Sequence, residues 1–439
     1  MVDETLGLLT LNALMYAAGA GLLLLVRWTS VAGLRRWVGL GYLAGVAWCG
    51  VAGGILLVCG LSFDRVEIAV VCAIPPGLAG LASRFRNGDQ AREAQPAGLG
   101  WLAAPAICIA GLAVVRAVVQ PLGTGAWDAW SFWTPKAESI VYFHGLSGGF
   151  LRSGVANADY PPLIPALESA AFRFMGQFDT TLVHVQFALL FLAFVAAAGE
   201  LLRGRTDSRI LAAVLIVIAA APAMYRQSTD AYADVPLAVF VSLGALLLWI
   251  GARERLPASF GLAGLLLAAA MATKAEGTLF TAAVTLSLLG VARRGRLQIL
   301  AAPLAAFAVT AVPWHLWLAA NHVHGLYSFH PGYLTDHADR FGRALAHLGG
   351  DLFNPILWLL LPVLVLVAIW VGVGGERRAE ALFVLGTVVL SILALDVTYW
   401  GSSYPFEWYL RTSASRIVTT PLLVAATFAP LLLSAKRRG

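Results

Sequence analysis

Long runs of apolar residues, separated by short polar segments, dominate the sequence. A helix needs about 20 apolar residues to cross the roughly 30 Å hydrocarbon core of a bilayer, and counting such runs predicts about thirteen spans. The predicted spans are 5–26, 37–60, 66–83, 99–119, 180–202, 209–225, 231–251, 257–273, 277–292, 298–319, 353–374, 380–397 and 413–434. We therefore expect an all-α polytopic membrane protein.

Composition excludes a water-soluble fold. Of the 439 residues, 59% are hydrophobic and only 12% are charged, whereas soluble domains carry about a quarter charged residues. The net charge of +6 does not indicate a nucleic-acid partner, because the basic residues lie in short loops between apolar runs. Membrane lipids are the expected surroundings.

Basic residues mark one set of alternate loops. Short cytoplasmic loops carry an excess of Lys and Arg, so this set is expected to face the cytoplasm. Its members are Arg27, Arg35, Arg36, Arg84, Arg86, Arg92, Arg203, Arg205, Arg209, Arg253, Arg255, Arg293, Arg294, Arg296, Arg377, Arg378, Lys436, Arg437 and Arg438. This orientation puts the amino terminus outside and the carboxy terminus inside.

The longer connections, at 120–179, 320–352 and 398–412, lie on the opposite, extracytoplasmic side, together with a short one at 226–234. These segments are rich in Asp, His, Trp and Tyr. Because functional residues concentrate on loops held by a rigid scaffold, we expect the functional site on this side.

Two short helices are predicted inside 120–179. Thr134 suits an N-cap and Pro135 the first helical position, in a helix that runs to about Phe143. A second helix is expected to begin at the Tyr160-Pro161-Pro162 turn and to end near Gly176. The first helix has an aromatic and apolar flank, which is typical of a helix lying in the membrane interface. That flank consists of Trp127, Trp130, Trp133, Ala137 and Val141.

Two carboxylates in this segment are candidates for chemistry. Asp128 lies among tryptophans just past the end of a span, where partial desolvation would make it a stronger base. Asp159 precedes Tyr160, whose backbone is expected to be extended because proline follows it. The alternative for both aspartates is structural, since Asp commonly forms and caps turns.

Charged residues also lie at the entrances of later spans. The turn at 226–234 supplies Arg226, Asp230 and Asp234, and an ionised Asp234 inside a span needs a partner or a function. Lys274 and Glu276 interrupt the apolar run at 257–292. Lys274 either binds a phosphate just outside the bilayer core, or extends to the interface and pairs with Glu276.

Arg411 and Arg416 open the last span. An anionic partner is the expected reason for Arg416, because the guanidinium fork matches phosphate oxygens. The segment 320–352 holds histidines between aspartates, so a divalent metal is an alternative to contact with a polar substrate, although the spacing matches no defined metal site. The histidines are His322, His324, His330, His337 and His347.

No Walker A motif and no glycine-rich dinucleotide loop occur in the sequence. No certain cofactor is therefore indicated. We expect the substrate to arrive already activated, and from the membrane.

Five motifs, in order along 99–434, carry a resemblance to a known family. They are Trp127-Asp128-Ala129-Trp130 followed by Pro135-Lys136-Ala137, then Asp159-Tyr160-Pro161-Pro162-Leu163, Ala233-Asp234-Val235-Pro236, Thr273-Lys274-Ala275-Glu276-Gly277, and Thr412-Ser413 with Arg416. Together they resemble the GT-C superfamily of membrane glycosyltransferases. The nearest branch is the bacterial one that includes protein O-mannosyltransferases and lipid A aminoarabinose transferases.

The resemblance implies an enzyme of the bacterial inner membrane with its active site on the periplasmic face. Such enzymes move a sugar from a polyprenyl-phosphate carrier to an extracytoplasmic acceptor, with inversion at the anomeric carbon. Asp128 would be the catalytic carboxylate and Asp234 a second acid. Lys274, Arg416 and either Lys136 or Arg226 would hold the donor phosphate. The remaining substrate-binding candidates are Asp159, Tyr160, Asp230, Glu276 and Arg411.

The resemblance also divides the chain. Residues 99–439 correspond to a GT-C-like catalytic module, with outer loops at 120–179 and 320–352, whereas 1–98 holds extra N-terminal spans. Only one acid occupies the Asp128 position, where protein mannosyltransferases have a pair. A lipid or glycan is therefore favoured over a protein as the acceptor.

Two other functions fit the sequence. An O-antigen polymerase or ligase also has many spans, a large outer loop and arginines that contact lipid pyrophosphate. A transporter would carry charged residues near span midpoints, for which Arg116 is the candidate. The aspartates at several span entrances favour the transferase.

Overall fold

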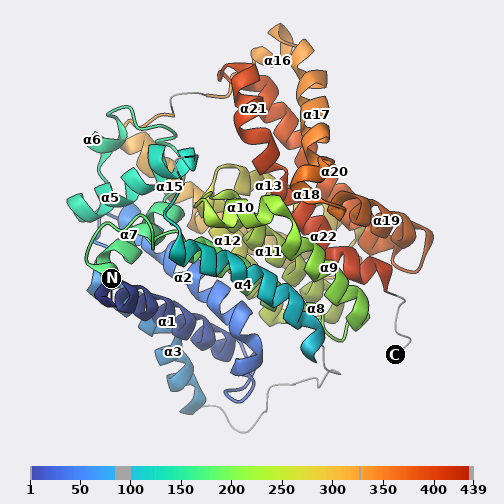
Figure 1. The fold of residues 1–439 in the computed structure, drawn as a ribbon, viewed down its shortest axis with the longest axis horizontal. Helices are drawn as coiled ribbons and strands as arrows, with labels where there is room; N and C mark the ends of the chain where they lie inside the picture. Colours follow the sequence, from blue (N-terminus) through green and yellow to red (C-terminus); the bar gives the residue numbers. More distant parts are fainter. Residues whose placement is uncertain (1, 85–99, 124, 326–327, 435–439) are drawn as a thin grey trace.

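A computed structural model describes residues 2–84, 100–123, 125–325 and 328–434. Over these residues the protein is all-helical, and the only strand-like pairing is an isolated antiparallel bridge between Phe329 and Ser402. This agrees with the predicted fold class. Figure 1 shows the helices packed side by side into one body, with α16, α17 and α21 projecting at one end.

Short turns precede three of the helices, at Leu34–Trp37, Gly100–Ala103 and Ala129–Trp133. The helices of the first half are α1 (Val2–Leu25), α2 (Val38–Val58), α3 (Arg65–Arg84), α4 (Ala104–Val119), α5 (Thr134–Phe143), α6 (Gly148–Leu151), α7 (Leu163–Met175), α8 (Val185–Leu202), α9 (Ser208–Ala220) and α10 (Pro222–Thr229). Those of the second half are α11 (Asp234–Glu254), α12 (Pro257–Thr273), α13 (Glu276–Val291), α14 (Arg296–Val309), α15 (Ala311–Ala320), α16 (Tyr333–Asp336), α17 (Asp339–Leu352), α18 (Pro355–Trp358), α19 (Leu361–Gly374), α20 (Arg378–Gly401), α21 (Phe406–Ile417) and α22 (Thr419–Leu433).

Helix length and hydropathy make the chain a multi-pass membrane protein. In the described part, eight helices are long and apolar enough to cross a bilayer, or ten if each of two bent pairs counts as one span. The other three predicted runs form the apolar helices α4, α12 and α13, of 16, 17 and 16 residues. At 1.5 Å per residue these reach only about 24–26 Å, short of the roughly 30 Å core.

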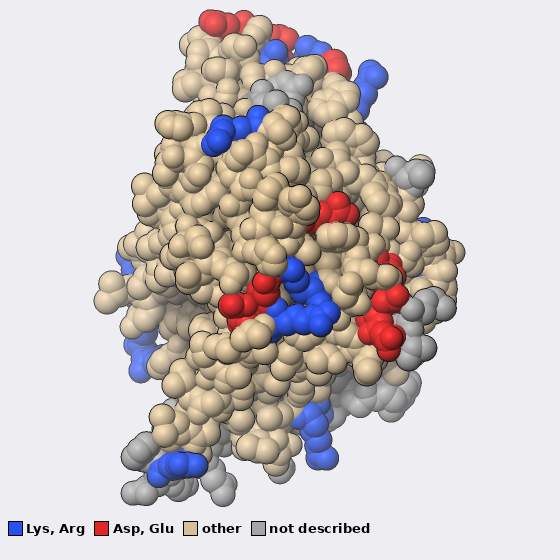
Figure 2. Space-filling model, turned by 90° about the vertical axis from the view of Figure 1, so that its left-hand side faces the viewer, with Lys and Arg blue, Asp and Glu red and all other residues tan. Residues whose placement is uncertain are grey.

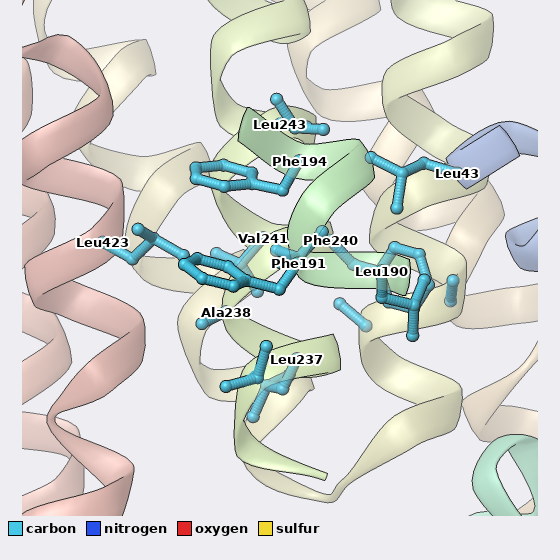
Figure 3. Packing of buried hydrophobic residues seen from close by; sticks show 14 of the residues in the cluster. Leu43, Leu190, Phe191, Phe194, Leu237, Ala238, Phe240, Val241, Leu243 and Leu423 are labelled. Atoms are coloured by element: carbon cyan, nitrogen blue, oxygen red, sulfur yellow. The ribbon is translucent and has the colours of Figure 1, made fainter. Parts of the chain in front are cut away.

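The centre of the bundle is α11, whose side chains are buried along almost its whole length. Figure 3 shows its residues Leu237, Phe240 and Leu243 packed among apolar side chains of α2, α8 and α22, such as Leu43, Phe191 and Leu423. A helix that is apolar on every face belongs inside a bundle rather than against water. Because Asp234 is its first residue, the placement of α11 also fixes one acid of the candidate site.

The N-terminal helices pack tightly on each other and on the rest of the chain. A Cβ on Gly19 of α1 would lie 1.7 Å from the carbonyl oxygen of Gly41 in α2, so only glycine permits this close approach. Helix α2 also contacts α7, α8 and α12, and one hydrophobic core runs from Leu8 to Leu432. The segment 1–98, as far as it is described, therefore shares its core with the segment 99–439.

The predicted helices of 120–179 form, with two corrections. The predicted interfacial flank does not face the lipid along its length, because Trp133 and Ala137 are fully buried in the hydrophobic core. Helix α7 ends at a left-handed Gly176, as expected, and α5 ends at Phe143. Thr134, however, is not an N-cap, because the helix already runs through a π-helical turn at Ala129–Trp133 and Thr134 has helical φ and ψ. Pro135 has no backbone N–H to donate to a carbonyl one turn back. The wider π-helical turn before it relieves the clash between the proline ring and the preceding turn that an α-helix would create.

The segment 320–352 is not a plain loop. It contains the short α16 and the longer α17, which packs against α20 and α21. The chain bends by 113° between the arm Asp339–Trp358 and α19, so the predicted span 353–374 is broken near its start and only Leu361–Gly374 forms the second arm. Phe341, Ala344, Leu345 and Leu348 recur at helical spacing along one face of α17, a periodicity that is visible in the sequence itself.

Arginines that were predicted to lie on the cytoplasmic side form ion pairs with glutamates near the ends of other helices. Arg36 lies 2.6 Å from Glu200, and Arg205 lies 2.5 Å from Glu254. Figure 2 shows the side of the molecule where α1, α5 and α7 lie, and there charged groups form only a few patches on an otherwise uncharged surface. A surface of this kind suits a protein surrounded by lipid.

Candidate active site

Five charged residues from four distant parts of the sequence meet in one network. Asp128 precedes the π-helical turn, Asp234 begins α11, Lys274 and Glu276 flank the break between α12 and α13, and Arg416 lies in the last turn of α21. All five were expected to lie on one side of the membrane. Their order in the network is Asp128, Arg416, Asp234, Lys274 and Glu276, so acids and bases alternate.

Arg416 joins the two aspartates. Its Nη1 lies 2.6 Å from Asp128 Oδ2 and 3.4 Å from Asp234 Oδ2, and its Nη2 lies 3.4 Å from Asp128 Oδ1. The guanidinium also lies 4.3 Å from the ring centroid of Tyr232, within cation–π range. A planar fork with five donors can hold two carboxylates and a ring at once, which a lysine could not do.

Lys274 joins Asp234 to Glu276. Its Nζ lies 2.9 Å from Asp234 Oδ1 and 3.9 Å from Glu276 Oε1. Lys274 is the extended residue at which α12 ends. Three residues later Gly277 is required, because a Cβ there would lie 2.1 Å from the carbonyl oxygen of Ala270. A cation at the end of α12 and an acid at the start of α11 also complement the helix dipoles.

The side chains at one end of the network are almost fully buried, and those at the other end are more exposed. The side chains of Asp234 and Lys274 are 2% and 6% exposed, whereas those of Asp128 and Arg416 are 13% and 15% exposed. Removing one member of a buried ion pair leaves an uncompensated charge and is strongly destabilising. The inner pair therefore joins the start of α11 to the end of α12, while Asp128 and Arg416 are the more exposed members.

A second cation lies beside the network. Lys136 of α5 is buried, and its Nζ lies 5.6 Å from the ring centroids of Phe132 and Trp133 and 5.9 Å from that of Tyr160. Lys274 Nζ lies 5.7 Å from the same Tyr160 ring, so this ring connects the two lysines. Lys136 donates a hydrogen bond to the carbonyl oxygen of Asn157.

Burial changes the protonation of Lys136. Desolvation lowers the pKa of Lys136 to about 7, although the nearby Asp159 carboxylate acts in the opposite direction. Desolvation also raises the pKa of Asp159, an effect that Lys136 and His315 oppose. Lysines with a lowered pKa are found at functional sites, where the charge can be switched near neutral pH.

No protein-family model, curated protein or solved structure matches this chain.

Among the described residues, the predicted site residues Arg226, Asp230 and Arg411, and also the transporter candidate Arg116, form no ion pair with the network. Asp230 lies near Arg116 and Arg226, but within the described residues neither arginine comes within 4.0 Å of the Asp230 carboxylate. Desolvation raises the pKa of Asp230. Arg116 lies in the last turn of α4, 5.5 Å from the Tyr225 ring, rather than at the middle of a span. Arg411 is exposed on α21 and makes no ion pair with any described residue.

The geometry holds no evident metal site. Among the described residues, no three His, Cys, Asp or Glu side chains gather closely enough to hold an ion. The histidines of 320–352 are dispersed: His330 and His337 flank Tyr333, and His347 lies 3.6 Å from Asp351.

Tyrosines complete the site, and the sequence interpretation did not single most of them out. Tyr232, beneath Arg416, donates a hydrogen bond to the Gly125 carbonyl oxygen at 3.0 Å and so ties 226–234 to 120–179. The Tyr409 ring stacks on that of Tyr404 at 4.5 Å between centroids and lies 4.4 Å from the Tyr399 ring at a tilt of 46°. Tyr404 donates to Asn157 Oδ1 at 2.7 Å. Their positions near predicted span ends were a usable signal, since tyrosine is enriched there.

Proposed function

We propose that this protein is an inverting glycosyltransferase that moves a sugar from a polyprenyl-phosphate donor to an extracytoplasmic lipid or glycan acceptor. The observation that carries the proposal is the alternating network itself. A reachable carboxylate, Asp128, lies bonded to an arginine, and two lysines lie within 6 Å of one tyrosine ring beside it. Such a site combines a base with several cations.

The reaction is a single displacement. Asp128 accepts the proton of the acceptor hydroxyl while that oxygen bonds to the anomeric carbon of the sugar. The bond between that carbon and the phosphate oxygen breaks, and the polyprenyl phosphate leaves with the electron pair. A base on one side of the sugar and cations on the other are what this step requires. Inversion follows because only one displacement occurs.

The pairing of Asp128 with Arg416 suggests how the donor prepares the base. In the free protein, Arg416 Nη1 lies 2.6 Å from Asp128 Oδ2, so the guanidinium occupies the carboxylate that has to accept the proton. A donor phosphate would compete for the same guanidinium, because phosphate oxygens fit its fork. Donor binding would thereby release Asp128 to accept a proton, while Asp234 keeps Lys274 in place.

The proposal extends to place and architecture. The basic loops support an extracytoplasmic position for the network, which in the family that the chain resembles corresponds to the periplasmic face of a bacterial inner membrane. We infer a GT-C-like arrangement for 99–439, with up to thirteen membrane segments if α4, α12 and α13 cross a locally thin bilayer. A single acid at Asp128 favours a lipid or glycan acceptor over a protein.

Reconstitution tests the proposed function directly. The purified protein in liposomes is incubated with a panel of polyprenyl-phosphate sugars labelled in the sugar, and with the matching nucleotide sugars as a comparison. Label should pass from at least one lipid-linked donor to an envelope lipid or glycan fraction, with release of polyprenyl phosphate. Transfer from nucleotide sugars alone, or vectorial uptake of label without a new covalent product, would refute the transferase.

Lys136 predicts a pH dependence of donor binding. With a pKa of about 7, Lys136 is charged below that pH and neutral above it, so phosphate binding that needs its charge weakens as the pH rises through 7. In Lys136→Arg the cation persists, because arginine remains protonated. The affinity for polyprenyl phosphate, measured for both proteins across this range, should fall more steeply with pH in the wild type. Parallel pH profiles would exclude Lys136 from phosphate binding.

A further inference from the structure

A pocket of about 480 Å³ lies where α11 and α13 end and α20 begins, on the predicted cytoplasmic side of the bundle. The turns after α11 and α13 and the turn before α20 supply its charged lining, which is Arg253, Arg255, Arg293, Arg294, Glu376 and Glu380. Four guanidinium groups and two carboxylates leave the pocket with a net charge of +2. A concave site of this charge attracts an anion.

The pocket is separate from the candidate active site. Helix α11 begins at Asp234, in the charged network, and reaches the pocket near its other end, at Arg253. At 1.5 Å per residue these two residues are about 28 Å apart along the helix, close to the thickness of the hydrocarbon core. A ligand in the pocket therefore cannot contact the network.

Much of the hydrogen-bonding capacity of the pocket is unused. Arg255, Arg293 and Arg294 are exposed and form no ion pair with any described residue. The carboxylate of Glu380 is buried, and its Oε1 lies 3.9 Å from Arg253 Nε and 3.8 Å from Arg377 Nη1, too far for hydrogen bonds.

Glu380 gives the pocket a second requirement besides negative charge. Its Oε1 accepts no hydrogen bond from any described residue, and a buried acceptor without a partner is costly. The pocket is therefore completed by a ligand that accepts hydrogen bonds from the arginines and donates one to Glu380.

The rest of the lining is apolar, which favours a lipid over a soluble anion. Trp249, Leu288, Val291 and Ala292 form this wall. Ala379 of α20 also lines the pocket, and Leu382, three residues further along the same face of the helix, is 41% exposed. Because α20 is a membrane helix, that face passes from the pocket to the surrounding acyl chains.

We propose that this pocket binds the headgroup of phosphatidylglycerol or another anionic glycerophospholipid of the cytoplasmic leaflet. The arginines hold the phosphodiester oxygens, Glu380 accepts from a hydroxyl of the headgroup, and the apolar wall contacts the first carbons of the acyl chains. Basic pockets between membrane helices on the cytoplasmic side bind anionic headgroups in this way. The proposal does not depend on sugar transfer, because the pocket shares no residue with the candidate active site.

Competition between lipids tests the headgroup. The full-length protein in detergent is mixed with equal amounts of phosphatidylglycerol, phosphatidylcholine and phosphatidylethanolamine, and native mass spectrometry counts the lipids that stay bound. Phosphatidylglycerol should be retained preferentially, and an excess of glycerol 3-phosphate or inorganic phosphate should not displace it. Equal retention of the three lipids would overturn the proposal, and displacement by either soluble phosphate would assign the pocket to a soluble anion instead.

Two pairs of arginines provide a matched comparison of variants. Arg293→Gln/Arg294→Gln removes two charges from the pocket and should weaken phosphatidylglycerol binding about tenfold, since charge-assisted hydrogen bonds to the phosphate are lost. Arg35→Gln/Arg209→Gln removes two exposed arginines from other predicted cytoplasmic segments, outside the pocket, and should leave binding unchanged. Equal weakening in both double variants would mean that general positive charge, and not this pocket, attracts the lipid.

Photolabelling locates the bound lipid without any substitution. The wild-type protein in liposomes is labelled with a phosphatidylglycerol that carries a diazirine next to its glycerol, and the modified peptides are mapped by mass spectrometry. Label should concentrate at the end of α13 and the start of α20, which border the pocket. Label spread evenly over the lipid-facing helices would contradict the assignment.

Discussion

Replacing Asp128 with asparagine is expected to lower sugar transfer by roughly 10²–10⁴-fold, the contribution of a general base. Asparagine keeps the size of the side chain but cannot accept the proton of the acceptor hydroxyl. The loss should appear in turnover at saturating donor, since Arg416 and the lysines that face the phosphate remain. Initial rates with purified protein and the donor found in the reconstitution panel measure it.

Asp207 provides the matched control. It caps α9 by accepting from the backbone nitrogens of Arg209 and Ile210, on the predicted cytoplasmic side. Asparagine caps helices about as well as aspartate, so Asp207→Asn removes one negative charge without a structural loss. Both variants should be produced and extracted from the membrane at wild-type levels. Turnover of Asp128→Asn within a factor of about three of the control would exclude Asp128 as the base.

The second large effect concerns the inner ion pair. Lys274→Met leaves Asp234 buried with only a 3.4 Å contact to Arg416, and Asp234→Asn leaves Lys274 with only Glu276 at 3.9 Å. Breaking a buried pair by removing one partner costs about 3–5 kcal/mol. Each single variant should therefore melt at a markedly lower temperature than the wild type in detergent.

The double variant Asp234→Asn/Lys274→Met distinguishes a coupled pair from two independent losses. It removes both charges, so it should be more stable than the sum of the single losses by at least about 1 kcal/mol. Thermal unfolding of the four proteins under identical detergent conditions gives this coupling. Strict additivity would mean that Asp234 and Lys274 do not stabilise the bundle through each other.

Much of the fold could be predicted because it depends on patterns within single segments. Apolar runs located the membrane helices, and Gly176 correctly ended α7. Other features of the fold depend on tertiary packing, which the apolar runs do not encode. The π-helical turn before Thr134 and the 113° bend before α19 depend on neighbours and on backbone strain, so the sequence alone did not indicate them.

The candidate site was partly predictable for a related reason. An ionised residue at a span entrance is costly unless it has a partner, and this rule singles out Asp234, Lys274 and Arg416 in the sequence. The rule does not specify the partner. Arg416 was expected to have an anionic partner, with phosphate oxygens as a suggested fit, and in the structure its partners are the carboxylates of Asp128 and Asp234. Arg411 carries the same sequence signal but lies exposed on another face of α21.

Mass spectrometry of envelope lipids and glycans tests the central claim most directly. Cells that produce the wild-type protein are compared with cells that produce equal amounts of Asp128→Asn. A lipid-linked sugar transferase that uses Asp128 predicts that the variant accumulates one polyprenyl-phosphate sugar and loses the corresponding glycosylated lipid or glycan. Identical lipid-linked sugars and identical glycans in the two strains would contradict it.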